Sequence, residues 1–123
     1  LVSRARTNTP LQSLVLLNDV QFVEASRKFA ERIMLEGGAS PEERITFAFR
    51  EALGRPPAEW ELETTLAAYQ RELKNYQAAP DAARSLLSQG ESTSDASLNP
   101  AEVAAWTTVG SMLFNTYEFM TRG

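Results

Sequence analysis

The densest run of polar side chains, residues 4–9, stands directly before a predicted helix start at Thr9-Pro10. Arg4, Arg6 and Asn8 offer guanidinium and amide donors there, and the free backbone amides of a helix start attract anions. This pattern is typical of a phosphate, sulfate or carboxylate site. The structural alternative is that Arg6 and Asn8 only tie down the terminal segment, with Arg6 paired to Asp19 or to the carboxyl end of a helix.

A second polar pair, Asn18 and Asp19, follows the first apolar run. An amide and a carboxylate between two helices suit a hydroxyl-rich ligand or a cation, although one carboxylate makes a poor metal site. As the structural alternative, Asn18-Asp19 ends one helix and Asp19 caps the next.

Aromatic residues suggest a surface on which a sugar or a base could stack. Tyr69, Tyr76, Trp106 and Tyr117 keep helical phase with leucines, so we expect them in the core. Trp60 lies just off its apolar stripe and is the candidate for sugar stacking.

Most other familiar chemistry lacks the residues that it needs. The sequence has no cysteine and no histidine, which excludes disulfides, thiol nucleophiles, imidazole bases and the commonest zinc ligands. The two lysines, Lys28 and Lys74, have no Ser-x-x-Lys spacing around them. Glu59, Glu61 and Glu63 are spaced by two and diverge on a helix, which predicts a solvated face. We therefore expect no catalytic residue, no metal site and no cofactor in this chain.

Charge and hydropathy limit the partners. The formal net charge is −4 and no basic patch is evident, so we expect no nucleic acid. The longest strongly apolar stretch, residues 14–17, is far shorter than the roughly 20 residues that cross a bilayer, so we expect no membrane insertion. Residue 1 is Leu and the helical pattern begins almost at once, which suggests part of a longer protein whose other domains are the expected partners.

Helix signals run from end to end, with no competing strand. Capping patterns, prolines at first turns and terminating glycines bound the predicted helices, which cover about 11–17, 20–36, 41–53, from just after Pro57 to 79, 81–89 and 100–120. With 123 residues, 43% of them hydrophobic, the chain is predicted to form one domain over 1–123. The fold class is all-α, a compact bundle of five to six mostly antiparallel helices, and no 34-residue repeat favours a solenoid.

Two details of this bundle are predicted separately. Gly110 in the apolar stripe of the last helix would allow another helix to approach closely. Residues 91–97 hold four serines and threonines with two acids and almost nothing to bury, which predicts an exposed, mobile loop.

Several strings resemble a known family: residues 6–19 (RTNTPLQSLVLLND), 22–25 (FVEA), 54–57 (GRPP), 105–107 (AWT) and 113–119 (LFNTYEF). They are similar to the C-terminal part of the Domain of Unknown Function 1553 family, over nearly the whole chain. The family pattern has Pro where this chain has Val20, and Leu-Asp where it has Thr116-Tyr117. The second departure argues against a required carboxylate at position 117.

The resemblance implies a setting more than an activity. Such proteins are typical of planctomycetes and are large and exported, often with a c-type cytochrome module and sometimes a lectin-like sandwich. The implied role is polysaccharide handling or surface redox chemistry. No catalytic residue can be carried over, and the haem motif Cys-x-x-Cys-His is absent.

Three hypotheses follow. The leading one is a noncatalytic helical module that packs within a larger exported protein. The second is that Arg4, Arg6, Asn8, Asn18 and Asp19 belong to a substrate site completed by upstream residues. The third is carbohydrate binding around Trp60.

Overall fold

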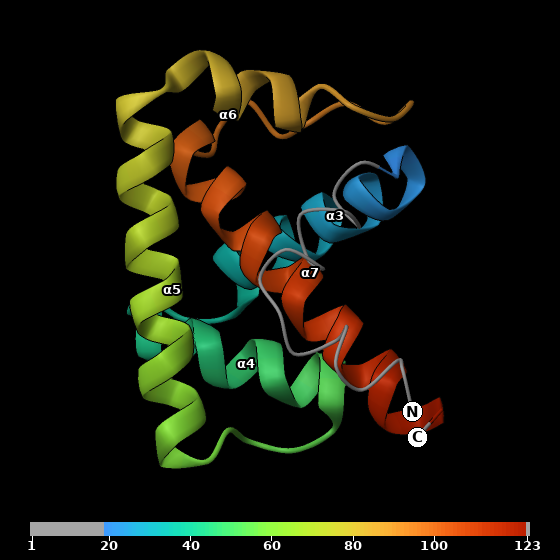
Figure 1. Ribbon diagram of the computed structural model, residues 1–123. Helices are drawn as coiled ribbons and strands as arrows, with labels where there is room; N and C mark the ends of the chain where they lie inside the picture. The colour runs from blue at the N-terminus through green and yellow to red at the C-terminus, as the bar shows by residue number, and fades with distance from the viewer. Residues whose placement is uncertain (1–18, 123) are drawn as a thin grey trace.

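The computed structural model describes residues 19–122, which form helices and connections without any strand. The five helices are α3 (Val20–Glu36), α4 (Pro41–Leu53), α5 (Glu59–Ala78), α6 (Pro80–Leu87) and α7 (Pro100–Arg122) (Figure 1). The all-α prediction is confirmed, and the helix predicted over 11–17 lies outside the described residues. None of the described helices is both apolar and long enough to span a bilayer.

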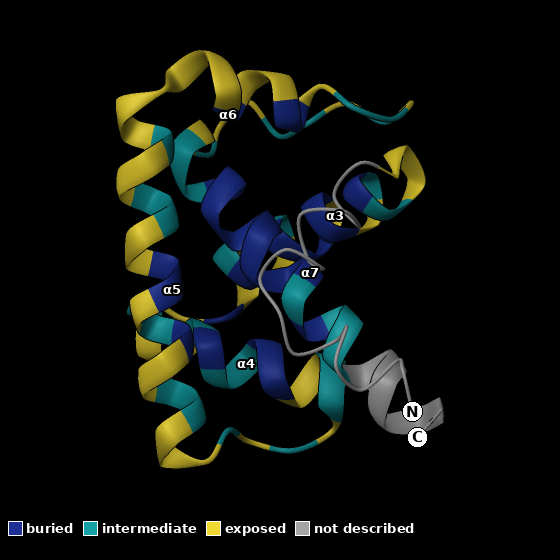
Figure 2. Cartoon of the chain, viewed as in Figure 1, coloured by how far each residue is buried: buried dark blue, intermediate teal, exposed yellow. Residues whose placement is uncertain are grey.

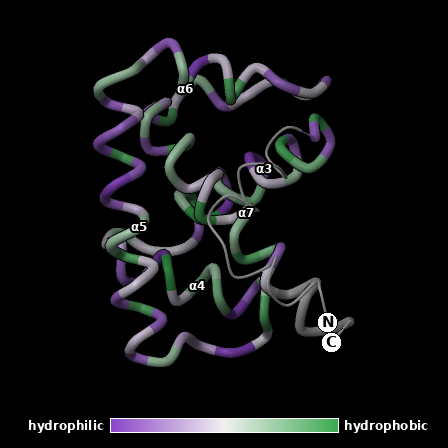
Figure 3. Tube along the Cα trace, in the orientation of Figure 1, coloured by the Kyte–Doolittle hydropathy of each residue, from purple (hydrophilic) through white to green (hydrophobic). Residues whose placement is uncertain are grey.

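Helix α7 is the centre of the bundle and contacts each of the other four helices. It runs diagonally across the view beside α5 and in the opposite sense, while α4 returns in the opposite sense to α3 (Figure 1). Residues 103–111 of α7 are all buried, as the continuous dark stretch in Figure 2 shows. The outer face of α5 is exposed and largely hydrophilic (Figure 3). Each peripheral helix therefore buries one stripe, whereas α7 is buried around nearly its whole circumference over residues 103–111.

Local sequence signals set the helix ends. Asp19 and Asn99 accept backbone N–H groups at the starts of α3 and α7. Ser40 and Glu43 form the reciprocal capping box of α4, and Gly54 ends that helix with φ of 76°. These caps confirm the predicted boundaries.

Close packing of α3 on α7 depends on a small residue. A Cβ atom at Gly110 would lie 3.0 Å from Cδ2 of Phe29, so the two helices approach as closely as Gly110 permits. One turn earlier on α7, the ring of Trp106 stacks on Tyr69 of α5 at 4.1 Å between centroids. The predicted close approach at Gly110 and the predicted core positions of Trp106 and Tyr69 are confirmed.

The connection between α6 and α7 differs from its prediction. Residues 91–97 were expected to be exposed and mobile. Four of them are exposed, but Ser92, Ser94 and Asp95 are partly buried and the segment is hydrogen-bonded to α3. The physical reason is Arg27, a buried cation of α3 whose Nη1 and Nη2 groups donate to Thr93 and Ser92 of the loop.

Candidate functional site

Of the polar residues predicted to form a site near the start of the chain, the structure describes only one. Arg4, Arg6, Asn8 and Asn18 lie outside the described residues. Asp19 is described, and its Oδ1 accepts the backbone N–H of Phe22 at 3.1 Å as the N-cap of α3. Helix capping accounts for this side chain without a ligand.

Trp60 is the most exposed large hydrophobic residue of the described chain. It is the second residue of α5 and 67% of its surface is accessible, whereas the other tryptophan, Trp106, is 0% exposed. The prediction that Trp60 lies off the core stripe is confirmed, and its role in binding stays a prediction.

The turn that leads to Trp60 is held rigidly. The Arg55 guanidinium donates to both carboxylate oxygens of Glu61, at 2.7 and 2.9 Å. The Cζ atom of Arg55 lies 5.9 Å from the centroid of the Phe49 ring. Glu61 also accepts the backbone N–H of Ala58 at 2.8 Å. The bond to Arg55, with the Ala58 bond, lowers the pKa of Glu61. A bidentate pair across a Pro-Pro connection fixes the start of α5 against the end of α4.

Two further carboxylates flank Trp60 on α5. Glu59 and Glu63 are exposed, and neither forms an ion pair with a residue in the described part of the chain. Glu63 lies one turn beyond both Glu59 and Trp60, at spacings of four and three. We call Glu59, Trp60 and Glu63 the Trp60 surface. Of the three glutamates that were expected to diverge, Glu61 does point away from the other two, because it binds Arg55.

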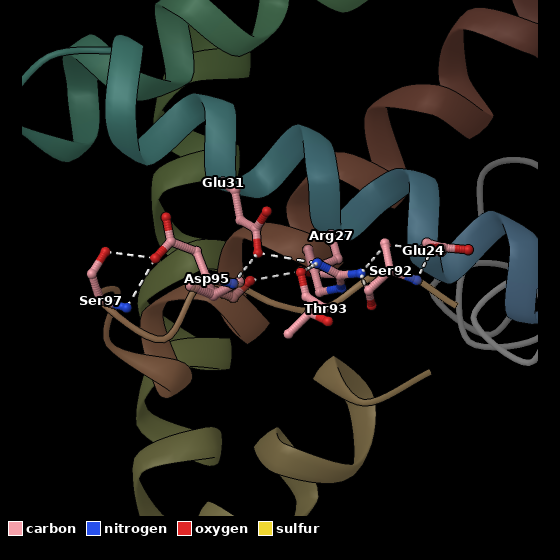
Figure 4. A network of polar contacts seen from close by, with 9 residues as sticks. Glu24, Arg27, Glu31, Ser92, Thr93, Asp95 and Ser97 are labelled. Atoms are coloured by element: carbon pink, nitrogen blue, oxygen red, sulfur yellow. Dashed lines mark hydrogen bonds and ion pairs between the residues drawn. The ribbon is translucent and has the colours of Figure 1, made fainter. Parts of the chain in front are cut away.

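The densest polar network within residues 19–116 is centred on Arg27, which sequence reasoning missed (Figure 4). Arg27 is only 1% exposed. Its Nη1 donates to Glu31 Oε2 at 3.1 Å, and its Nη2 donates to the carbonyl oxygen and the hydroxyl of Ser92 at 2.9 and 2.6 Å. Glu31 Oε2 also accepts the backbone N–H of Asp95 at 2.9 Å. The network joins one face of α3 to the loop before α7.

Glu24 anchors the same loop one turn earlier on α3. Its Oε2 accepts both the hydroxyl and, at 2.7 Å, the backbone N–H of Ser92. These two bonds lower the pKa of Glu24. Gly90 allows the loop to approach the Glu24 side chain. Its φ is 90°, and a Cβ atom at this position would lie 2.5 Å from Cδ of Glu24. The carboxylate is thus bound by the chain's own loop.

The sequence does carry a signal for Arg27. The buried stripe of α3 includes Val23, Ala30 and Ile33, and Arg27 follows Val23 by four residues and precedes Ala30 by three. A lone arginine inside an apolar stripe predicts a buried cation that needs partners. Its partners in the loop lie more than sixty residues away, which no local pattern reveals.

Two open hollows border described residues. One of about 300 Å³ lies where α5, α6 and α7 meet and includes Tyr76, Arg84 and Asn99. Asn99 Oδ1 already accepts the N–H of Glu102, and burial raises the pKa of Tyr76. The other, of about 730 Å³, lies beside Glu24 and Ser92, which bind each other. Among the described residues, no three acidic side chains gather in a way that would hold a metal ion.

Comparison with known proteins assigns a family without an activity. Neither the curated proteins nor the solved structures contain a match to this chain. Residues 1–69 match the family described as PSD1, protein of unknown function (DUF1553). This match covers the start of the chain through α3, α4 and the first half of α5. The chain therefore belongs to the DUF1553 family of proteins of unknown function.

Proposed function

We propose that this chain is a noncatalytic helical module that packs against other domains of a longer protein, with the Trp60 surface as its contact. The observation that carries the proposal is the exposure of Trp60, 67%, on a turn held by Arg55 and Glu61. Tryptophan is enriched among the residues that dominate binding energy at protein interfaces. A rigid turn lowers the entropy cost of docking such a side chain.

The polar network around Arg27 favours a scaffold role over a catalytic one. Arg27, Glu24 and Glu31 are engaged by Ser92 and Asp95, so their charges hold the fold together. Asp19, the described member of the predicted substrate site, is likewise a cap. The family resemblance supports an exported, multidomain protein concerned with polysaccharide handling or surface redox chemistry as the setting.

The test is an amide-resolved NMR titration of the labelled chain with the remaining domains of the longer protein, expressed separately. We expect shifts concentrated over residues 54–63. Trp60→Ala should weaken binding by at least about tenfold. Leu35→Ala is the matched control, because Leu35 is 62% exposed but lies on α3.

Three outcomes would contradict the proposal. One is the absence of shifts when the other domains are added. Another is equal binding by the Trp60→Ala and Leu35→Ala variants. The third is loss of a chemical step, rather than of assembly, when residues of this chain are changed.

A second candidate, carbohydrate binding, is favoured by the same exposed indole, which would stack on a sugar ring. Trp106 is buried, so titration with an oligosaccharide such as cellohexaose should change only the Trp60 fluorescence. A Trp106→Phe variant, which retains Trp60 alone, isolates that signal. A flat titration in this variant would remove the candidate.

A further inference from the structure

We infer that the Trp60 surface binds an arginine side chain presented by a protein partner. The inference rests on the proposed function and deepens it by naming the chemistry of the docking segment. Its basis is the combination of one exposed indole with two carboxylates that have no ion pair among the described residues.

Helix geometry places these three groups together. Successive residues of an α-helix are rotated by about 100°, so Glu63 lies between the directions of Glu59 and Trp60, one turn further along. All three residues are exposed in the structure. An extended side chain that crosses this turn would contact the indole and both carboxylates.

Within the part of the chain that the structure describes, no cation pairs with Glu59 or Glu63. Residues 54–63 contain one arginine and three glutamates, and the arginine is neutralised by Glu61. Glu59 and Glu63 remain as like charges four residues apart, an arrangement that weakens a helix. The helix dipole favours Glu59 in the first turn, but its effect falls off before Glu63. A bound cation would remove the repulsion.

Arginine fits this arrangement better than other cations. The guanidinium is planar, stacks on an indole face and donates in a fork to carboxylates. Lysine supplies a compact, strongly hydrated charge that cannot stack in this way. Arg55 shows the same chemistry inside the chain, because its guanidinium lies over the Phe49 ring while it bonds both oxygens of Glu61.

The test uses N-acetyl hexa-arginine amide as the probe and the fluorescence of the full chain as the readout. Because Trp106 is buried, a Trp60→Phe variant provides the blank. We expect a saturable change in emission, with a Kd that rises with salt concentration. The double variant Glu59→Gln/Glu63→Gln should weaken binding by about five- to tenfold.

The matched control is Glu42→Gln/Glu91→Gln. It removes the same amount of negative charge at two other exposed sites, one at the start of α4 and one in the loop between α6 and α7. We expect less than about twofold weakening there. Equal weakening by the two double variants would show nonspecific attraction to an acidic protein and overturn the inference. Equal affinity for hexa-lysine would also overturn it.

The failures of the inference and of the proposed function are distinguishable. If hexa-arginine causes no change but the other domains still bind in a Trp60-dependent way, the arginine inference is wrong and the docking module stands. If hexa-arginine binds as expected but the other domains do not bind, the proposed function is wrong. A response to cellohexaose without one to hexa-arginine would overturn the inference in favour of carbohydrate binding.

Discussion

Arg27 and Ser92, 65 residues apart in sequence, are joined by two hydrogen bonds from one guanidinium nitrogen, at 2.9 Å to the carbonyl oxygen and 2.6 Å to the hydroxyl. The loop before α7 is therefore fixed on α3 by a buried charge. Because Glu24 and Glu31 bind backbone N–H groups of the same loop, the attachment has three points along one helix face.

Removing Arg27 should destabilise the fold strongly. Arg27→Ala would leave a cavity and deprive Glu31 and Ser92 of their donor, at a cost of about 3 kcal/mol. Arg32→Ala is the control, because Arg32 is 48% exposed and its ion pairs to Glu36 and Glu51 are solvated, so about 1 kcal/mol or less is expected. Urea unfolding followed by circular dichroism measures both. Similar losses in the two variants would contradict the account of the network.

Gly90 should tolerate alanine worse than Gly54 does. Both have positive φ, but a Cβ at Gly54 meets nothing within 4 Å, whereas at Gly90 it would overlap Glu24. We expect about 1 kcal/mol for Gly54→Ala from backbone strain, and at least about 2 kcal/mol for Gly90→Ala. Thermal unfolding gives the comparison. The Gly90→Ala cost should shrink in a Glu24→Ala background, and an unchanged cost would mean that Glu24 is not the obstacle.

Acid should weaken the loop attachment through Glu24. Hydrogen bonds from Ser92 lower the pKa of Glu24 in the folded chain below the ordinary 4.5. The unfolded chain then binds the proton more tightly, so the contribution of Glu24 is complete above pH 4.5 and is lost as pH falls through the lower folded value. The free energy of unfolding should therefore fall less between pH 5 and pH 3 in Glu24→Gln than in the wild-type chain. Parallel pH profiles would refute this linkage.

Asp19→Ala tests whether this residue is a cap or part of a site. Loss of its bond to the Phe22 N–H should cost about 1 kcal/mol of stability. Asp19→Asn retains an oxygen acceptor and should recover most of that loss. If instead the longer protein lost activity while both variants kept full stability, the substrate-site hypothesis would gain support.

Sequence patterns predicted the local features of this fold well. Ser40 and Glu43, Asp19, Asn99 and Gly54 act within one or two helical turns of their own positions, so the sequence next to them is sufficient. The same holds for the buried Trp106, which lies at helical spacing from the other apolar residues of α7.

Prediction failed where a residue's partner is distant in sequence. The loop over residues 91–97 looks like a solvated connection because its composition is polar. Its role depends on Arg27, and neither segment alone shows that the fold brings them together. In the candidate site, the position of Trp60 off its stripe was readable from the sequence. The bidentate pair of Arg55 and Glu61 was missed although the two residues are only six apart, because it depends on the course of the Pro-Pro connection between them.

The central position of α7 has a consequence for biosynthesis. Helices α3 to α6 leave the ribosome before the helix that all four of them contact. Until α7 emerges, Val23, Ile33, Tyr69 and Leu86 lack the helix that α3, α5 and α6 each contact most extensively, and they stay available to chaperones. Folding of this chain is therefore expected to be completed only after most of it has been translated.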